Sequence, residues 1–183
     1  VIVEDLGLIT DDVVTLREIL GFPGMNVLHF AFDGDPSNNY LPHNNKRHSV
    51  TYSATHDNQT TVGWWQSISE EDRDRVRHYL GHSVEDPAWD LLRVALSSPA
   101  NTAIVPMQDV LRLDDRARMN TPATTYGNWS WKMRPDQLDP GLADGLRDLT
   151  STYGRISDDF PERSVSEYDY SAPTSGIKAT RSW

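Results

Sequence analysis

Three acidic residues, Glu4, Asp33 and Asp57, each follow a segment rich in apolar or β-branched residues. Carboxylates placed after strands can donate or accept protons in catalysis. In parallel α/β folds the C-terminal ends of the strands form one edge where sites are built, so we expect these acids to converge there. Asp33 and the nearby Asp35 also suit a local role in shaping a turn. Glutamate is a poor capping residue, and partial burial of Glu4 would favour the protonated form that a general acid needs.

An imidazole, a carboxylate and an amide stand side by side at His56, Asp57 and Asn58. Such a set suits the binding of neighbouring sugar hydroxyls through several fixed hydrogen bonds. This pattern favours a carbohydrate ligand.

Aromatic residues near or after the acidic segments support a carbohydrate site, because flat rings stack on sugar faces; they are Trp64, Trp65, Tyr126, Trp129 and Trp131. Core packing is the alternative for every ring, and it is favoured for Trp89 on an apolar helix face. Trp64 and Trp65 are adjacent, so at least one is expected to pack inward. Asn128, in an irregular segment beside Trp129, suits ligand contact better than a scaffold role.

Composition excludes several other kinds of site. The 183 residues include no cysteine, which removes disulfides, thiolate zinc sites, iron–sulfur clusters and a cysteine nucleophile. The six histidines show neither an HExxH motif nor ligand spacing, and the GxSxG motif of serine hydrolases is absent. Lysine and arginine total 17 against 27 acidic residues, and this net charge of -10 disfavours nucleic acid as a partner. A mean hydropathy of -0.59 without a long apolar run disfavours a membrane span.

The elements that position these residues alternate between strands and helices. Strands are predicted at 1–3, 25–32, 50–55 and 102–105, and helices at 10–20, from 60, at 69–81, from 86 and from 139. The first helix carries Val13, Leu16, Ile19 and Leu20 on one face. This alternation predicts a parallel α/β sheet covered on both faces, with apolar strands. Residues 109–133 are expected to be mostly irregular.

Five separated strings resemble the amylomaltase family of 4-alpha-glucanotransferases, called disproportionating enzyme in plants and algae. They are EDLG at 4–7, GFPGMNVLHFAFD at 21–33, YLPHN at 40–44, THDNQTTVGWW at 55–65 and RMNTPATTYGNWSW at 118–131. The similarity runs in the family's order over residues 1–155. It implies an α/β fold that forms the C-terminal part, about four βα units, of a (β/α)8 TIM-type barrel. Residues 1–155 would belong to the catalytic barrel, and residues 156–183, rich in polar residues, would form a flexible tail.

The resemblance implies transfer of 1,4-alpha-glucan segments between maltooligosaccharides or starch, with retention and without metal or organic cofactor. Glu4 of EDLG matches the general acid/base, and Asp57 of THDN matches the acid that stabilises the transition state. His56 matches a substrate-contacting histidine, Phe30 an aromatic on the acceptor side and Asn128 a polar contact to glucan. The expected site therefore has Glu4 and Asp57 as catalytic residues, with substrate bound by His56, Asn58, Phe30, Asn128 and Trp129.

The family's nucleophile, an aspartate on an earlier barrel strand, has no match in this sequence. A retaining displacement needs two carboxyl groups about 5 to 5.5 Å apart, and spacing alone leaves that role open to Asp57. A complete barrel typically needs about 250 residues. The chain is thus expected to be a fragment that is inactive without the N-terminal half of the barrel. A catalytically inactive carbohydrate-binding or interaction module, and a hydrolase that admits water to the intermediate, are the alternatives.

The expected partners are alpha-1,4-glucans and maltooligosaccharides, with neither nucleic acid nor membrane. Cytoplasm and plastid stroma both suit a cysteine-free, acidic glucan enzyme.

Overall fold

The computed structural model describes residues 1–156, whose strands form one three-stranded parallel sheet in the order β1-β2-β3. The strands are β1 (Gly24–Val27), β2 (Ser49–Tyr52) and β3 (Thr102–Ile104). Met25 of β1 lies opposite Val50 of β2, and Thr51 of β2 lies opposite Ala103 of β3. The predicted α/β class with a parallel sheet is confirmed. The predicted tail, apart from residue 156, lies outside the described residues.

The described sheet has three strands where the sequence pattern predicted four. Residues 1–3 belong to no strand; their link to the segment before β1 is one backbone hydrogen bond, in which Val3 N donates to Pro23 O (3.2 Å). A β-branched run favours an extended chain, but a strand also needs a repeated hydrogen-bond ladder. The prediction of apolar strands was also wrong for β2, because buried Thr51 is satisfied by hydrogen bonds with Asn45 and Ser98.

Six α-helices occur in the described residues: α1 (Asp11–Ile19), α2 (Thr61–Ser67), α3 (Glu70–Leu80), α4 (Pro87–Ser97), α5 (Met107–Val110) and α6 (Pro140–Thr152). Their ends follow the capping residues of the sequence. The Ser69 side chain accepts from Asp72 N at the start of α3, and Gly81 ends that helix in the left-handed conformation. Asp86 and Asp139 cap α4 and α6 in front of prolines. Within residues 1–156 no helix has both the length and the apolar character needed to cross a membrane.

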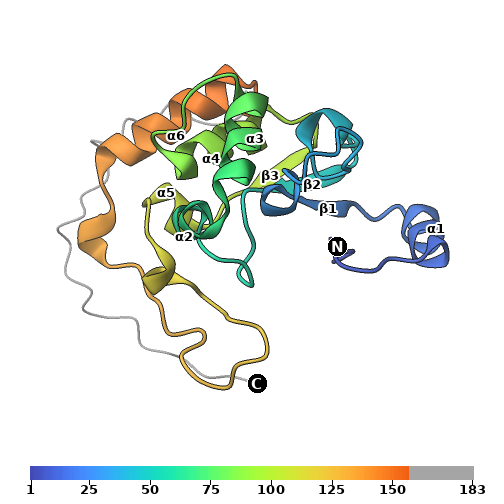
Figure 1. Ribbon diagram of the computed structural model, residues 1–183, viewed down its shortest axis with the longest axis horizontal. Helices are drawn as coiled ribbons and strands as arrows, with labels where there is room; N and C mark the ends of the chain where they lie inside the picture. Colours follow the sequence, from blue (N-terminus) through green and yellow to red (C-terminus); the bar gives the residue numbers. More distant parts are fainter. Residues whose placement is uncertain (157–183) are drawn as a thin grey trace, which may run out of the picture.

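The main core lies where α2, α3 and α4 gather on one side of the sheet (Figure 1). It is built from Leu28, Phe32, Trp64, Val76 and Leu91, together with neighbouring small and aliphatic side chains. A second cluster joins α4 to α6, and there Leu92, Val110 and Leu149 are buried with Trp89 packed against them. The inward packing predicted for Trp89 and for one of the adjacent tryptophans, Trp64, is therefore confirmed.

Two connections differ from a regular βα repeat. Between β1 and β2 the chain forms only two short 3-10 turns, Leu28–Phe30 and Pro42–Asn44, whereas α2, α3 and α4 all lie between β2 and β3. Helix α1 stands away from the other helices (Figure 1) and buries none of its residues. On its predicted apolar face Val13, Leu16 and Ile19 are 40%, 57% and 76% exposed. No other segment within residues 1–156 buries this face.

Candidate active site

A pocket of about 610 Å³ lies at the C-terminal edge of the sheet. Its walls come from the residues that follow the strands: Phe30 after β1, the segment 54–60 after β2, and Pro106 and Gln108 after β3. Glu4 from the N-terminal segment and Trp129 from the irregular region complete it. The predicted gathering of site residues at this edge is confirmed for Glu4 and Asp57.

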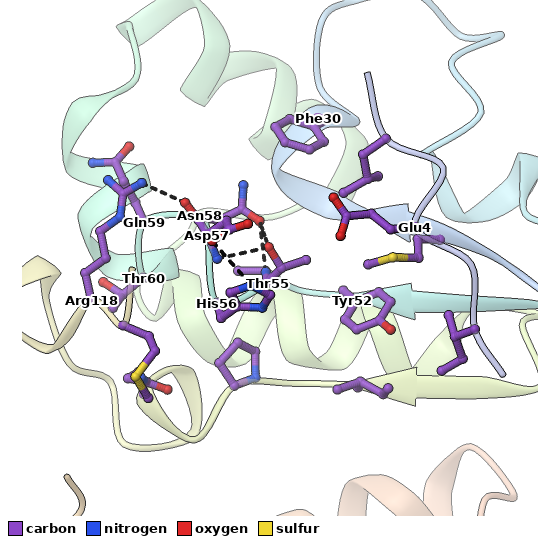
Figure 2. A pocket seen from close by; sticks show the side chains of 18 of the residues that line it. Glu4, Phe30, Tyr52, Thr55, His56, Asp57, Asn58, Gln59, Thr60 and Arg118 are labelled. Atoms are coloured by element: carbon purple, nitrogen blue, oxygen red, sulfur yellow. Dashed lines mark hydrogen bonds and ion pairs between the residues drawn. The ribbon is translucent and has the colours of Figure 1, made fainter. Parts of the chain in front are cut away.

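Glu4 reaches into the pocket from a segment that its neighbour Asp5 fastens to the sheet. The Asp5 carboxylate accepts a hydrogen bond from Met25 N of β1 (2.7 Å) and pairs with the Arg17 guanidinium. A Cβ on Gly24 would meet the ends of both side chains of this ion pair, so a larger residue there would make the pair shift. The Glu4 carboxylate points toward the side of the pocket where Asp57 lies (Figure 2). Glu4 itself is exposed, so the partial burial expected for it is not present in the described residues.

The turn after β2 holds its shape through its own side chains. Asn58 Oδ1 accepts from Thr55 N (2.9 Å) and from the Thr55 hydroxyl (2.7 Å), and Asn58 N donates to Thr55 O (3.2 Å). The Thr55 hydroxyl in turn accepts from Asp57 N (3.3 Å). Asn58 thus lines the pocket while its side-chain oxygen closes the turn, which fixes the backbone that carries His56 and Asp57 (Figure 2).

Asp57 is 40% exposed at its side chain and is held from two directions. His56 Nε2 lies 3.3 Å from Asp57 Oδ1, and the Asn120 amide donates to the same oxygen. A carboxylate that is partly fixed and partly open to the pocket can interact with sugar hydroxyls or with positive charge that develops on a sugar ring.

Aromatic rings border the two acids. Phe30 is 44% exposed and meets Tyr40 edge-on at 5.6 Å between ring centres. Trp129 is 62% exposed, and its ring centre lies 5.1 Å from that of His56. Such exposed rings can stack on sugar faces. Tyr126 and Trp131, the other aromatic candidates after residue 118, do not line this pocket.

Asn128, also predicted to bind substrate, lies outside the pocket lining. Its Oδ1 accepts from Thr121 N (2.9 Å), and its amide donates to Thr124 O (3.1 Å). The side chain therefore closes the loop that presents Trp129, whose φ of 58° is a left-handed conformation. The Asp33 carboxylate accepts a hydrogen bond from Asp35 N (3.0 Å) within its own loop. This is the turn-shaping role that the sequence offered for Asp33 as the alternative to a catalytic one.

A buried chain of polar groups lies beneath the turn. Fully buried Asp109 accepts from the Ser53 hydroxyl (2.7 Å), Thr61 N (2.8 Å) and the Thr61 hydroxyl (2.8 Å). Because the Thr61 proton goes to Asp109, the contact of Thr61 Oγ1 with His29 Nε2 (3.0 Å) requires that His29 donates. Burial lowers the pKa of His29 to about 3 and raises the pKa of Asp109. A neutral imidazole stacked on Trp64 at 4.7 Å thus supports the floor of the site.

Several residues of the site were missed by the sequence interpretation. Arg118 and Met119 line the pocket, and Asn120 contacts Asp57 from outside the lining. All three belong to the RMN string at 118–120, which carried part of the family resemblance, although no local periodicity marked them as partners of residues 56 and 57. Asp109 gave no signal because it lies within the short helix α5 after β3 and belongs to none of the family strings.

No group of three or more His, Asp or Glu side chains arranged to hold a metal ion was found among residues 1–156. The absence of a metal cofactor stays a prediction.

Comparisons with known proteins agree on one family. A family model described as 4-alpha-glucanotransferase matches residues 1–138. The chain is 49% identical over 160 residues to a chloroplastic/amyloplastic 4-alpha-glucanotransferase of Arabidopsis thaliana, and 49% identical over 157 residues to the 4-alpha-glucanotransferase of Synechocystis. These matches cover 85% of this chain but 28% and 31% of the two relatives. The chain therefore spans less than a third of the length of these relatives.

Solved structures give the same result. The amylomaltase from Streptococcus agalactiae in complex with acarbose superposes with a TM-score of 0.81 at 32% identity, over 84% of this chain and 32% of that one. The amylomaltase from Corynebacterium glutamicum, at 18% identity and a TM-score of 0.53, shares the fold. Since the family model matches residues 1–138 of 183, the chain belongs to the 4-alpha-glucanotransferase family.

Proposed function

We propose that this chain supplies the general acid/base and the transition-state-stabilising acid of a 4-alpha-glucanotransferase. The observation that carries the proposal is the convergence of Glu4 and Asp57 on one pocket, in a chain that belongs to this family. Exposed Phe30 and Trp129 in the same pocket supply the apolar surfaces that a glucan chain requires.

In the proposed reaction the enzyme moves a 1,4-alpha-glucan segment by retaining double displacement. Glu4 protonates the leaving glycosidic oxygen and later removes the proton from the 4-hydroxyl of the acceptor. Asp57 stabilises the positive charge that develops on the sugar ring, while His56 beside it binds a hydroxyl. In the first displacement a nucleophilic carboxylate about 5 to 5.5 Å from the acid/base bonds to the anomeric carbon as the glycosidic oxygen leaves, and in the second the acceptor 4-hydroxyl displaces that carboxylate. We do not assign this nucleophile to Asp57.

We further propose that the three-stranded sheet is part of a (β/α)8 barrel, to which this chain contributes about four βα units. The TM-score of 0.81 to an amylomaltase and the position of the pocket at the C-terminal edge of parallel strands support this architecture. Residues 1–155 would then form the barrel part.

The proposed substrates are maltooligosaccharides and starch. The acarbose complex of the Streptococcus agalactiae amylomaltase supports an oligosaccharide ligand, and the chloroplastic/amyloplastic relative supports plastid stroma beside cytoplasm as a location. Chemistry of this type uses side-chain carboxyls alone, so EDTA is expected to leave the transfer rate unchanged. Loss of activity that added metal restores would contradict this part of the proposal.

The test uses Glu4→Gln and Asp57→Asn in the complete gene product. Both variants should bind maltotriose, because the replacements keep size and hydrogen-bonding capacity. Removal of a positioned acid/base should lower kcat by about 10² to 10⁴-fold. Asp57→Asn should lose more turnover than ground-state affinity, since its contact strengthens in the transition state.

Near-normal transfer by Glu4→Gln would refute its assignment. A loss of affinity alone in Asp57→Asn would make Asp57 a binding residue. Binding without transfer by the wild-type gene product would favour the inactive carbohydrate-binding alternative.

A further inference from the structure

Two residues far along the chain, Arg118 and Asn120, clamp the turn that carries Asp57. Arg118 donates from its terminal guanidinium nitrogen to Asp57 O (2.7 Å), and Asn120 N donates to His56 O (3.1 Å). The Asn120 amide donates to Asp57 Oδ1. The backbone carbonyls of His56 and Asp57 and one Asp57 carboxylate oxygen are therefore held by a single short segment.

Further hydrogen bonds hold residues 118–120 in place. Arg118 Nε donates to Asn120 O (2.9 Å), so one guanidinium ties Asn120 and Asp57 together. Trp129 N donates to Met119 O (2.7 Å), which joins the segment to the loop whose indole packs beside the His56 ring. Fixed donors of this kind leave the carboxylate little freedom to rotate.

The two oxygens of Asp57 have different surroundings. Oδ1 accepts a hydrogen bond from the Asn120 amide and lies 3.3 Å from His56 Nε2. Oδ2 accepts no hydrogen bond from any residue in the range 1–156. Asn120 is half-buried and lies outside the pocket lining, whereas Asp57 lines it. The Asn120 side chain therefore acts on a ligand through the Asp57 carboxylate that it contacts.

We propose that Asn120 is a positioning residue, which fixes the rotation of the Asp57 carboxylate so that Oδ1 is engaged by the protein and Oδ2 is presented to the sugar. The inference rests on the proposed function and assigns the substrate-facing atom within it. A carboxylate that must stabilise a transition state gains from such fixing, because a misplacement of about 1 Å can cost about 10²-fold in rate.

The test compares Asn120→Ala and Asn120→Asp with the wild type in the complete gene product, using kcat and KM for maltotriose and crystal structures of both variants. Asn120→Asp keeps the size of the side chain and the backbone hydrogen bond to His56, but it replaces the donor by a carboxylate facing Asp57. We expect kcat to fall about 10- to 100-fold in Asn120→Ala and further in Asn120→Asp, with KM changed by less than about threefold. In both crystal structures the Asp57 carboxylate should rotate away from its wild-type orientation.

Asn44→Ala is the matched control. Asn44 is also half-buried, and its amide donates to two backbone carbonyls, Pro36 O and Asn38 O, at 2.9 Å each. It should leave kcat unchanged. A smaller loss in Asn120→Asp than in Asn120→Ala, or an Asp57 carboxylate unmoved in the crystal structures, would overturn the inference. If the wild type transfers no glucan, the proposed function fails, and the orientation of Asp57 in the crystal structures still decides the positioning role.

Discussion

Asp109 and His29 show how single buried groups support the active-site floor. Asp109 has no cationic partner among the described residues, so three hydrogen bonds from Ser53 and Thr61 compensate its burial. His29 extends this chain at Thr61 and stacks on Trp64. The neutral tautomer with its proton on Nε2 donates to Thr61 without placing a charge beside the Trp64 indole.

His29 predicts a pH dependence of stability. Its pKa is about 3 in the folded protein and 6.5 in an unfolded chain, so between these values only the unfolded state binds the proton. Stability is thus greatest above pH 6.5 and falls as the pH drops toward 3, by at most about 1.4 kcal/mol per pH unit. His29 as a whole residue is half-buried, so the slope should be smaller than this limit.

Urea unfolding at pH 6.5 and pH 4.5 checks this dependence. Wild type should lose more stability over this interval than His29→Gln, which keeps a donor but does not titrate there. Equal losses in the two proteins would contradict the assignment of a neutral, buried His29.

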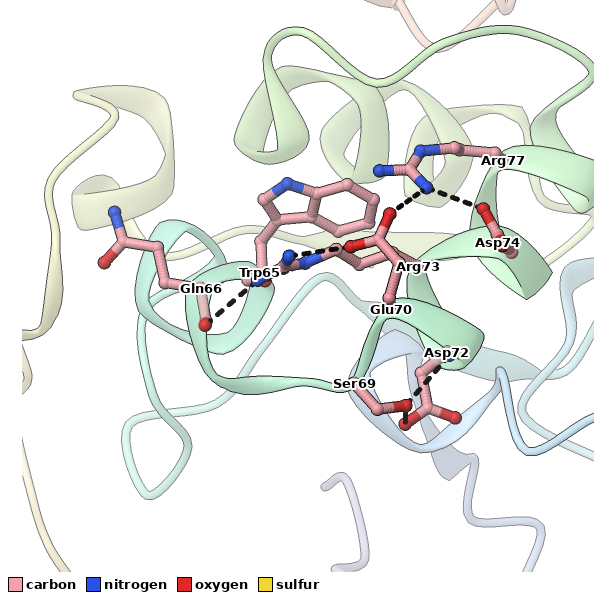
Figure 3. A network of polar contacts seen from close by, with 8 residues as sticks. All are labelled: Trp65, Gln66, Ser69, Glu70, Asp72, Arg73, Asp74 and Arg77. Carbon is pink, nitrogen blue, oxygen red and sulfur yellow. Dashed lines mark hydrogen bonds and ion pairs between the residues drawn. The ribbon is translucent and has the colours of Figure 1, made fainter.

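At the scale of elements, Arg73 joins α2 to α3. Helix α2 ends without a glycine cap, and Arg73 satisfies its last carbonyls by donating to Trp65 O (2.9 Å) and Gln66 O (3.1 Å), as Figure 3 shows. Arg73 also pairs with Glu70, and Arg77, one turn later, forms ion pairs with Glu70 and Asp74. Both guanidinium groups lie over the Trp65 ring, at 5.7 and 5.6 Å from its centre.

This geometry makes Arg73 and Arg77 a matched pair for lysine replacement. The cation–π contact with Trp65 and an ion pair with Glu70 are common to both arginines, so the difference between the two variants reports on the two carbonyl hydrogen bonds of Arg73. We expect Arg73→Lys to lower the free energy of unfolding by about 1 to 2 kcal/mol, and Arg77→Lys, which weakens only exposed ion pairs, to have a clearly smaller effect. Equal effects in chemical denaturation would contradict a capping role for Arg73.

The start of α2 depends on a second long-range cap. Asp115 accepts from Thr60 N (3.0 Å) and Gln59 Nε2 (2.7 Å), and its carboxylate occupies the space that a Cβ on Gly63 would take. Gly63→Ala should therefore displace Asp115 and destabilise the protein by about 1 to 3 kcal/mol. Gly141→Ala in the first turn of α6, where a Cβ meets nothing closer than 3.4 Å, should be neutral or stabilising by up to about 1 kcal/mol. Thermal unfolding that ranks the two variants in the opposite order would refute this account of the Asp115 cap.

Across the whole molecule, the sequence predicted the features that depend on neighbouring residues, such as the starts of helices. Ser69, Asp86 and Asp139 marked helix starts because capping is a local hydrogen bond. Glu4 and Asp57 were correctly expected to lie together, although Glu4 follows no strand and its segment is held to β1 through Asp5. These inferences needed only periodicity, turn residues and motif resemblance.

The remaining features depend on contacts between distant segments, which no local pattern encodes. Asp109 meets Thr61 across 48 positions, and Asn120 meets Asp57 across 63. Asn128 looked available for ligand because its segment is irregular, but the loop folds its amide inward. The apolar face of α1 was recognisable as a helix face, while its exposure within residues 1–156 depends on tertiary packing.

In the proposed reaction Glu4 and Asp57 act as separate catalytic acids of a glucan transfer, and another carboxylate is the nucleophile. The most direct measurement incubates maltotriose with the 183-residue chain and, separately, with the complete gene product, and resolves the products by length. We predict a ladder of glucose and longer oligosaccharides from the complete gene product alone. A ladder from the 183-residue chain as well would mean that Asp57 or another acid here serves as nucleophile, and the division of roles would be wrong.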